Sequence, residues 1–396
     1  MKNKEKKNMK PEISDITASD KKPEKTKSAV KTVCKVLGIT LIVILLVVGI
    51  YVAYVFISYK RIPDNQTLES ESPANGNTVS SASSLTTDRT YSIITSNIGF
   101  GAYDDEFDFF MDGGSRSWAR SKDAVVENVD TLVGKIADEN ADFVFLQEMD
   151  IDGTRSYHVN EYERARNILG SYSSIFAMNY DSPFLFWPLY QPHGSNKAGI
   201  GTFYKVGKFT SSIRRSLPIS ESFSKVVDLD RCYSVTELEC SNGKTLTLIN
   251  VHLSAYGADE SVQQSQLDML FEDMQKAYDK GNYVIVGGDF NHDMIGDSNE
   301  RYGNGISEEQ SWAKAFPFDQ IPSNFTLGSR YLLSEGRFDC AATCRDTSTV
   351  LKDDSNMWYL DAFIYSDNIE MISYDTLDYG FQNSDHNPVK MTFRLK

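Results

Sequence analysis

Residues 283–293 read YVIVGGDFNHD, a hydrophobic run that passes through two glycines into Asp-Phe-Asn. Asp289 and Asn291 are two residues apart, so on an extended chain their side chains point to the same face. An acid at the end of a buried strand loses water, which is unfavourable unless a cation or a transferable proton compensates it. Gly287 and Gly288 let another backbone or a ligand come close. This stretch therefore predicts a buried strand whose end presents a carboxylate and an amide to a water molecule, a metal ion or a phosphate.

Similar polar residues stand at the ends of other predicted strands. They occur in the segments ITSNIGFG, FVFLQEMD, LINVHLSAYG, LDAFIYS and NSDHNPV, and they are Asn97, Glu148, His252, Asp361, Asp385 and His386. Taken singly, each has an ordinary structural explanation, since Asn is common in turns and a buried His or Asp is usually satisfied by a neighbour. Their occurrence together favours a common site.

The chain between residues 90 and 396 mixes many strands with few helices. Helical spacing of apolar residues predicts a helix over 121–140, capped by Ser121, and another over 259–280, closed by Gly281. Runs rich in β-branched and aromatic residues predict strands, with SNGK as a hairpin turn between two of them. Strands joined by hairpins favour two mixed sheets covered by helices over a doubly wound parallel sheet. We therefore expect an α/β (α+β) domain over residues 90–396.

The ordered set of Asn, Gln-Glu, Asn-x-His-Leu, Gly-Asp-x-Asn, Asp and Ser-Asp-His-x-Pro-Val resembles the endonuclease/exonuclease/phosphatase superfamily. That superfamily includes pancreatic deoxyribonuclease, apurinic endonucleases, bacterial sphingomyelinases and inositol polyphosphate phosphatases. The resemblance covers nearly all of residues 90–396. It implies a four-layer sandwich of two packed sheets between helices, with a site for metal-dependent phosphoester hydrolysis at one edge.

The resemblance and phosphoester chemistry together assign roles to the acids and amides. Glu148, with Asn97 close by, would hold a divalent cation, in the first place Mg²⁺ and alternatively Mn²⁺. Asp289 would act as the base toward the attacking water, and Asn291 would orient that water.

The histidines of the set are expected to face the phosphate. His386, held by Asp385, would be its cationic partner, and His252 would act from the other side as a donor or general acid. Asp361 is expected to support the metal or His252.

Further residues beside the motifs have weaker assignments. Arg231 and Arg345 could contact the phosphate, since Arg suits bidentate recognition, although surface arginines are more common. His292 is expected to lie behind the site or in solvent. Pancreatic deoxyribonuclease has an Arg two positions after its metal-binding Glu, whereas this chain has Asp150, which weakens a nuclease assignment. Residues 99–114, GFGAYDDEFDFFMDGG, predict either a lid over the site or a structural insertion.

The N-terminal part of the chain differs in charge from the rest. Residues 1–61 contain 13 Lys and Arg against 5 Asp and Glu, so residues 62–396 carry −23 although the whole chain carries −15. Residues 36–58 are 23 residues without a charge, about 35 Å as a helix and enough to cross a bilayer. The run is too long for the apolar part of a cleaved signal peptide, the competing interpretation. The basic flank before it predicts a cytoplasmic N-terminus and a domain outside the cytoplasm, on a single-pass membrane protein.

The segments on either side of this anchor are polar. Residues 1–35 are expected to form a disordered basic tail, and residues 59–89 a flexible linker that holds the domain off the membrane. Cys232 and Cys240 would lie about 26 Å apart on one extended strand, which excludes a disulfide between them. Cys340 and Cys344 could pair across a loop, or remain small buried thiols.

These observations favour a membrane-anchored, Mg²⁺-dependent phosphoesterase outside the cytoplasm that acts on a small phosphate ester, a phosphodiester or a lipid head group. The enzymatic alternative is an extracellular nuclease acting on DNA or RNA. It is disfavoured because nucleic-acid binding normally relies on Lys and Arg, and the domain carries −23. The non-enzymatic alternative is a silent cell-surface binding module, against which the intact residue set argues. The sequence indicates no obligate protein partner.

Overall fold

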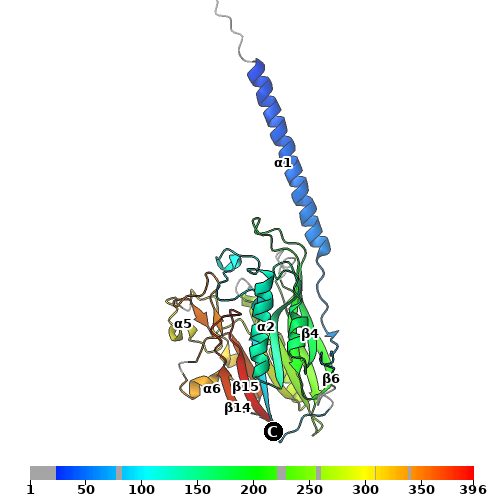
Figure 1. Cartoon of the computed structure of the whole chain (residues 1–396), viewed down its shortest axis with the longest axis vertical. Helices are drawn as coiled ribbons and strands as arrows, with labels where there is room; N and C mark the ends of the chain where they lie inside the picture. Colours follow the sequence, from blue (N-terminus) through cyan, green and yellow to red (C-terminus); the bar gives the residue numbers. More distant parts are fainter. Residues whose placement is uncertain (1–23, 77–82, 221–228, 256–259, 308, 338–339) are drawn as a thin grey trace, which may run out of the picture. The chain divides into compact units, whose positions relative to one another are not determined.

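A computed structural model describes residues 24–76, 83–220, 229–255, 260–307, 309–337 and 340–396. Contacts divide the chain into two units, Met1–Phe56 and Ile57–Lys396. The first contains all but the last two residues of helix α1 (Glu24–Ser58), whose segment Ala29–Ser58 is long and apolar enough to span a membrane (Figure 1). Of the predicted disordered tail, residues 1–23 lie outside the described residues, and the remainder is helical instead.

The second unit is built on two mixed sheets. The seven-stranded sheet has the order β1 (Gln66–Thr67), β6 (Lys208–Ser216), β7 (Cys232–Glu239), β8 (Thr245–His252), β9 (Tyr283–Asp289), β13 (Asp361–Ser366) and β10 (Phe325–Leu327). The six-stranded sheet has the order β14 (Ile369–Thr376), β15 (Val389–Leu395), β2 (Thr90–Asn97), β3 (Phe143–Gly153), β5 (Asn196–Tyr204) and β4 (Ser173–Asp181). Strands β11 (Cys344–Arg345) and β12 (Met357–Trp358) form a separate pair. In each sheet most neighbours are antiparallel, but β2 with β3 and β8 with β9 are parallel.

Helices cover the outer faces of the sheets. Helix α2 (Lys122–Asp138) lies against the six-stranded sheet together with α3 (Glu161–Ile168), and Val129 and Leu132 of α2 share one apolar cluster with Val144 of β3 (Figure 1). Helix α4 (Glu260–Asp279) covers the seven-stranded sheet. The shorter helices are α5 (Ser298–Arg301) and α6 (Ser329–Ser334), with 3₁₀ turns at Gly99–Gly101, Phe110–Asp112 and Phe318–Gln320. The result is the four-layer sandwich that the sequence predicted.

The local signals explain where the two long helices begin and end. The side chain of Ser121 accepts a hydrogen bond from the backbone N–H of Ala124, which satisfies one free donor of the first turn of α2. Gly281 follows α4 with φ of +85°, a conformation that glycine adopts without strain. Between the sheets, aromatic and branched side chains such as Phe145, Ile249 and Phe363 are fully buried in one core.

The segment predicted to be a flexible linker is instead part of the domain over much of its described length. Strand β1 pairs with β6, and Leu68 and Leu85 are buried in the main core. Residues 77–82 lie outside the described residues. The polar composition of the segment predicted a linker outside the domain. A few buried apolar residues and backbone pairing are nevertheless enough to hold a segment on a large sheet.

Candidate active site

The predicted site residues come from separate strands and meet at one edge of the sandwich. Strands β2, β3, β8 and β9 end there, while β13 begins there and β15 begins three residues after His386. The pairing places Asp289 opposite His252 in β8 and opposite Asp361 in β13. The topology therefore brings together side chains that are up to about 290 residues apart in the sequence.

Two site residues have a left-handed backbone that non-glycine residues rarely adopt. Glu148 has φ of +55° and lies at an irregularity in the pairing of β3 with β5, between Leu146 and Met149. Asn291 has φ of +50°. Such conformations cost about 1–3 kcal/mol each and cluster at functional sites. The bulge turns the Glu148 side chain out of the strand alternation and toward the edge of the sheet.

The two glycines of the opening stretch are required by packing rather than by a ligand. A Cβ on Gly287 would lie 2.3 Å from the Phe363 ring, and a Cβ on Gly288, where φ is +145°, would lie 2.0 Å from the Val251 carbonyl oxygen. Strand β9 therefore passes so close to its neighbours that no side chain fits. The expected close approach is present, and its partner is protein.

Asp289 is buried and held from two sides. Asn97 Nδ2 donates to its Oδ2 at 3.1 Å, and the backbone N–H of Asn291 donates to its Oδ1 at 2.8 Å. The side chain of Asn291 lies 3.4 Å from Oδ2 and donates to the Leu253 carbonyl at 2.9 Å. Burial raises the pKa of Asp289 to about 6, with His386 opposing the rise and Asp361 adding to it. These contacts fix the carboxylate in one orientation at the edge of the sheet.

The partner of His386 differs from the prediction. His386 Nδ1 lies 2.7 Å from Oδ2 of Asp361, so Asp361, and not the predicted Asp385, holds this histidine. Burial lowers the pKa of His386, but Cys344, Asp361 and Asp385 together raise it well above its usual value. Its Nε2 lies 3.9 Å from Oδ2 of Asp289. The raised pKa favours the protonated imidazolium, and the ring is oriented toward Asp289.

His252 and Glu148 complete the cluster. His252 Nε2 lies 3.5 Å from Oε1 of Glu148 and 3.7 Å from Oδ2 of Asp289. Burial, together with the nearby charges of Arg231 and His386, lowers the pKa of His252 well below its usual value, so the ring is neutral. Burial raises the pKa of Glu148 to about 7, and the neighbouring carboxylate of Asp385 adds to the rise.

This electrostatic arrangement fits a divalent cation. Glu148, His252 and Asp289 can each direct one ligand atom to a common point, with those atoms within 4.8 Å of one another. Burial also raises the pKa of Asp385, because it disfavours the ionised form of this acid as well. Carboxylate oxygens are the ligands that Mg²⁺ and Mn²⁺ prefer, and a bound cation removes the penalty of ionising them. Asn97, predicted as a metal ligand, also donates from its Nδ2 to Asp289 and so orients that carboxylate.

The two predicted arginines have different surroundings. Arg345 is fully buried and donates to the backbone carbonyls of Asp104, Phe107 and Asp346, so it is a structural residue and the predicted phosphate contact is wrong. Arg231 lies at the site edge, where its Nη1 donates to the Leu253 carbonyl at 2.7 Å. Arg231 therefore remains a candidate for a phosphate contact.

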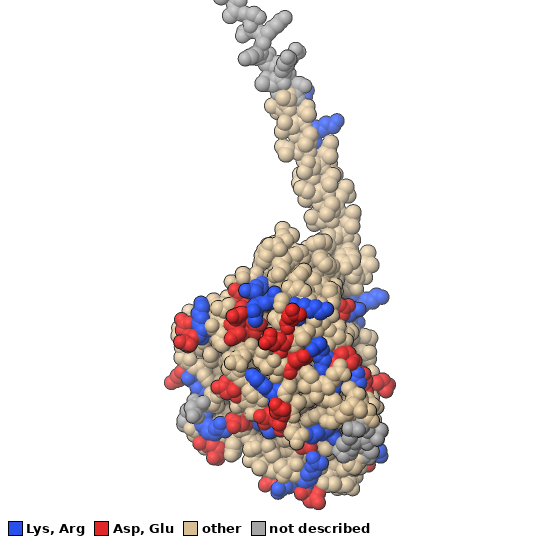
Figure 2. Space-filling model, viewed as in Figure 1, with Lys and Arg blue, Asp and Glu red and all other residues tan. Residues whose placement is uncertain are grey.

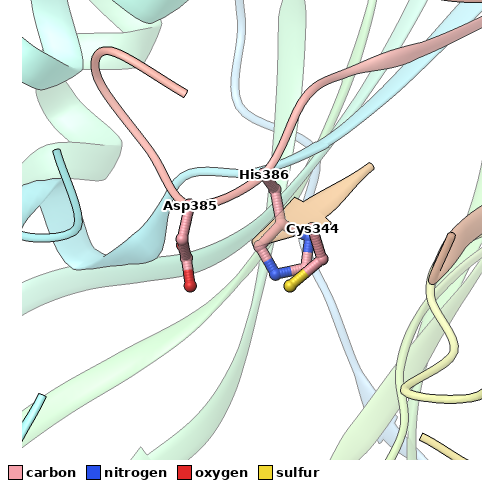
Figure 3. Close-up of side chains that lie close together, drawn as sticks. All are labelled: Cys344, Asp385 and His386. Atoms are coloured by element: carbon pink, nitrogen blue, oxygen red, sulfur yellow. The ribbon is translucent and has the colours of Figure 1, made fainter. Parts of the chain in front are cut away.

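Three residues near the site were not predicted to have a role there. Cys344 lies beside His386 and Asp385, and their ligand atoms are within 4.8 Å of one another (Figure 3). Gln147 Nε2 donates to Oδ1 of Asn250 at 2.7 Å, which joins the two sheets directly behind Glu148. The Gln-Glu and Asn-x-His spacings contain this signal, because a polar residue next to a site residue on a buried strand needs a partner in the core.

Other predictions around the site are settled by burial. His292 is buried, with Nδ1 2.7 Å from the Phe290 carbonyl, so it lies behind the site and not in solvent. All four cysteines of the domain are buried free thiols, and Cys340 and Cys344 are not paired. Asp150 is a buried partner of Arg155, whose Nη2 lies 2.8 Å from Oδ1.

A family model described as Endonuclease/Exonuclease/phosphatase family matches residues 94–386. The chain belongs to this family. Its members are metal-dependent phosphoesterases and nucleases, and the chain is accordingly a metal-dependent phosphoric ester hydrolase. No curated protein matches the chain.

Several solved structures are similar to the chain at low sequence identity. An endonuclease/exonuclease/phosphatase from Beutenbergia cavernae is 15% identical, with a TM-score of 0.52, over 78% of this chain and 72% of that one. The human nocturnin catalytic domain with bound sulfate is 18% identical, with a TM-score of 0.48, over 78% of this chain and 95% of that one. A TDP2 from D. rerio complexed with a single-strand DNA product is 17% identical, with a TM-score of 0.49, over 78% of this chain and 100% of that one. The likeness to the Beutenbergia cavernae protein concerns the fold, and none of the three indicates a substrate.

Proposed function

We propose that the protein is a membrane-anchored phosphoesterase that hydrolyses phosphate esters or phosphodiesters of lipid head groups or small molecules outside the cytoplasm. The observation that carries this proposal is the convergence of Glu148 and Asp289 on one atom, Nε2 of His252, at 3.5 and 3.7 Å. Both acids have pKa values raised by burial, to about 7 and about 6. Such a pair needs a cation to ionise fully, and the Glu148 side chain is partly exposed.

The residues of the site divide the reaction between them. Asp289, oriented by Asn97 and Asn291, takes a proton from the attacking water. His386, kept protonated beside Asp361, donates to a phosphate oxygen. Neutral His252 donates to the phosphate from the opposite side.

Glu148, with Asp289 and Asp385 near it, would hold Mg²⁺ or Mn²⁺. When bound, this ion polarises the phosphate and stabilises charge on the leaving oxygen.

Charge supports a small or lipid substrate over nucleic acid. Residues 62–396 carry −23, and Figure 2 shows Lys and Arg interspersed with Asp and Glu on the viewed face rather than gathered into a basic stripe. A nucleic-acid site normally uses a concentrated basic surface. The excess of Lys before α1 supports a cytoplasmic N-terminus, which places the domain outside.

Full-length protein in lipid nanodiscs tests the proposal with bis(p-nitrophenyl) phosphate, p-nitrophenyl phosphate and supercoiled plasmid, each with Mg²⁺ or EDTA. We expect turnover of one of the small esters with Mg²⁺, loss of turnover in EDTA, and loss of turnover in Asp289→Asn. Ester turnover that persists in EDTA and in Asp289→Asn would contradict the proposal. Metal-dependent plasmid nicking without ester turnover would make the protein a surface nuclease.

A further inference from the structure

The loop between β4 and β5, residues 182–195, exposes large apolar side chains to solvent. Phe186, Trp187, Leu189 and Tyr190 are between 50% and 75% exposed. The loop sequence SPFLFWPLYQPHGS contains no Asp, Glu, Lys or Arg, in a domain rich in all of them. A contiguous exposed group of this kind marks an interaction surface, because solitary exposed apolar residues are ordinary but clusters are not.

Hydrogen bonds fix the base of this loop on the domain, whereas the four large apolar side chains at its tip are largely exposed. The backbones of Leu185 and Gly194 exchange two hydrogen bonds, at 2.9 and 3.0 Å. Trp118 Nε1 donates to the Pro192 carbonyl at 2.7 Å, and the Tyr190 hydroxyl donates to the Ser115 carbonyl at 2.7 Å. The loop is therefore an ordered, hairpin-like structure with the apolar residues at its tip.

The loop rises from the same end of the sandwich as the active site. Strands β3 and β4 are both antiparallel to β5, so they run in the same direction and end on the same side. Strand β3 carries Glu148 and continues past it, and the backbone N–H of Thr154, just beyond that strand, donates to the Ser195 carbonyl at the foot of the loop at 3.0 Å. Figure 1 shows this loop, in dark green, above the upper end of β4.

The chain that follows the anchor helix joins the domain at this end too. Helix α1 ends at Ser58, and the next residue, Tyr59, already donates from its hydroxyl to Oδ1 of Asp230 at 3.1 Å. The backbone N–H of Ile62 donates to Oδ2 of the same residue at 2.9 Å. The residues that directly follow α1 are therefore held on the domain by Asp230.

Asp230 connects this attachment point with both the loop and the site. Arg214 is buried and donates to the Asp230 carbonyl at 2.6 Å and to the Met178 carbonyl in β4 at 2.7 Å, three residues before β4 ends. Arg231, the residue after Asp230, donates to the carbonyl of Leu253, next to His252. The anchor attachment, the apolar loop and the catalytic edge therefore share one end of the sandwich.

We propose that residues 182–195 form a membrane-docking loop whose apolar tip enters the interface of the bilayer that holds α1, so that the active site works on phosphoesters of lipid head groups in that bilayer. This inference rests on the proposed membrane anchoring and phosphoesterase activity. Trp and Tyr favour the interfacial zone of bilayers, and an uncharged aromatic tip suits that zone. A bilayer is favoured over a protein partner because the residues that directly follow the anchor helix attach to the same end of the sandwich as the loop.

Quenching of tryptophan fluorescence tests the docking directly. The four tryptophans are Trp118, Trp187, Trp312 and Trp358, so the anchor contains none. Full-length protein is reconstituted in phosphatidylcholine vesicles with plain or dibrominated acyl chains, and wild type is compared with Trp187→Phe. We expect bromine to quench a component of the wild-type emission that Trp187→Phe lacks. Equal fractional quenching in the two proteins, or none in either, would overturn the docking.

A turnover ratio tests the lipid substrate. In vesicles of phosphatidylcholine and phosphatidylglycerol, we expect the triple variant Phe186→Ser/Trp187→Ser/Leu189→Ser to lose at least about tenfold in head-group release, with bis(p-nitrophenyl) phosphate turnover changed less than about twofold. The matched control is Ile372→Ser, an exposed apolar residue in edge strand β14, which should leave both rates unchanged.

The possible failures are distinguishable. Soluble-ester turnover without any lipid turnover, or an unchanged ratio in the triple variant, overturns the lipid-substrate inference while the phosphoesterase stands. Absence of turnover on every substrate contradicts the proposed function itself, and the quenching result then still decides whether the loop docks.

Discussion

Buried charges occur in two neighbouring regions of the domain, and they are compensated differently in each. In the acidic and aromatic insertion after Asn97, Asp104 is almost fully buried but receives Nε and Nη2 of Arg120 at 3.0 and 2.8 Å and Nδ2 of Asn128 at 3.1 Å. At the proposed catalytic edge, neither Glu148 nor Asp289 forms an ion pair with a Lys or Arg among the described residues, and His386, at 3.9 Å from Asp289, offsets only part of the effect of burial. Burial therefore raises the pKa of both acids.

The difference shows which buried acids are structural and which are reactive. A carboxylate paired with a guanidinium and an amide, as Asp104 is, contributes to folding. A carboxylate that the fold holds in place but leaves undercompensated keeps affinity for a proton or a cation. The same substitution made in the two regions should accordingly change activity in one and stability in the other.

Asp289→Asn should have the largest effect. The amide keeps the shape of the side chain but cannot accept a proton from water, so kcat/KM on the small ester should fall on the order of 10³-fold. The thermal midpoint should not fall, because burial disfavours the ionised acid that is removed. Initial rates and differential scanning calorimetry measure the two quantities.

Asp361→Asn should have a smaller effect on rate. Its Oδ2 lies 2.7 Å from His386 Nδ1, and the amide would weaken the hold on the imidazolium. We expect kcat/KM to fall by about 10–100-fold. Because the pKa of His386 should fall without the carboxylate, the decline of kcat/KM on the alkaline side should occur at a lower pH than in wild type. An unchanged pH profile would remove Asp361 from the support of His386.

Asp104→Asn is the matched variant in the insertion. It removes the charge that Arg120 faces, and we expect a loss of about 2 kcal/mol in the free energy of unfolding, a fall of about 4 °C in the thermal midpoint. Activity per folded molecule should stay within about twofold of wild type. A large loss of kcat/KM at unchanged stability would place the insertion in the catalytic machinery.

The smallest effect is expected on how the stability of the metal-free protein depends on pH, through Glu148. The folded pKa of Glu148 is about 7 against an ordinary value of 4.5, so the folded state binds this proton more tightly than the unfolded state. The resulting stability is present at pH below 4.5 and is lost as pH rises through 7, on the order of 2 kcal/mol because the side chain is partly exposed. In EDTA, Glu148→Gln should weaken this decline by a few degrees, which thermal melts between pH 5 and 8 measure.

The sequence predicted the strands that carry the site better than the strands at the margins. Strand β9 has a continuous apolar run and ends at Asp289 as expected, and α2 has its predicted cap at Ser121. Strands β6 and β14 were not predicted, since both are half exposed and contain few regularly alternating apolar residues. Their positions depend on neighbours far along the chain.

Pairing within the site was the part that the sequence predicted wrongly. Asp385 was expected to hold His386 because the two are adjacent, yet neighbouring side chains on an extended chain point in opposite directions. Asp361 reaches the ring because β13 pairs with β9 in a register that sets Asp361 against Asp289. Arg345 was predicted to be a phosphate ligand because Arg suits bidentate recognition. Its guanidinium instead donates to backbone carbonyls, and no sequence motif reveals such contacts.

The most direct test of the account is a calorimetric titration of Mg²⁺ into the full-length protein at pH 7.5, on wild type, Glu148→Gln and Asp104→Asn. If the catalytic edge holds undercompensated acids that require a cation, wild type and Asp104→Asn should bind Mg²⁺ with the same affinity, while Glu148→Gln should bind at least about tenfold more weakly. Equal binding by wild type and Glu148→Gln, or loss of binding in Asp104→Asn, would contradict it.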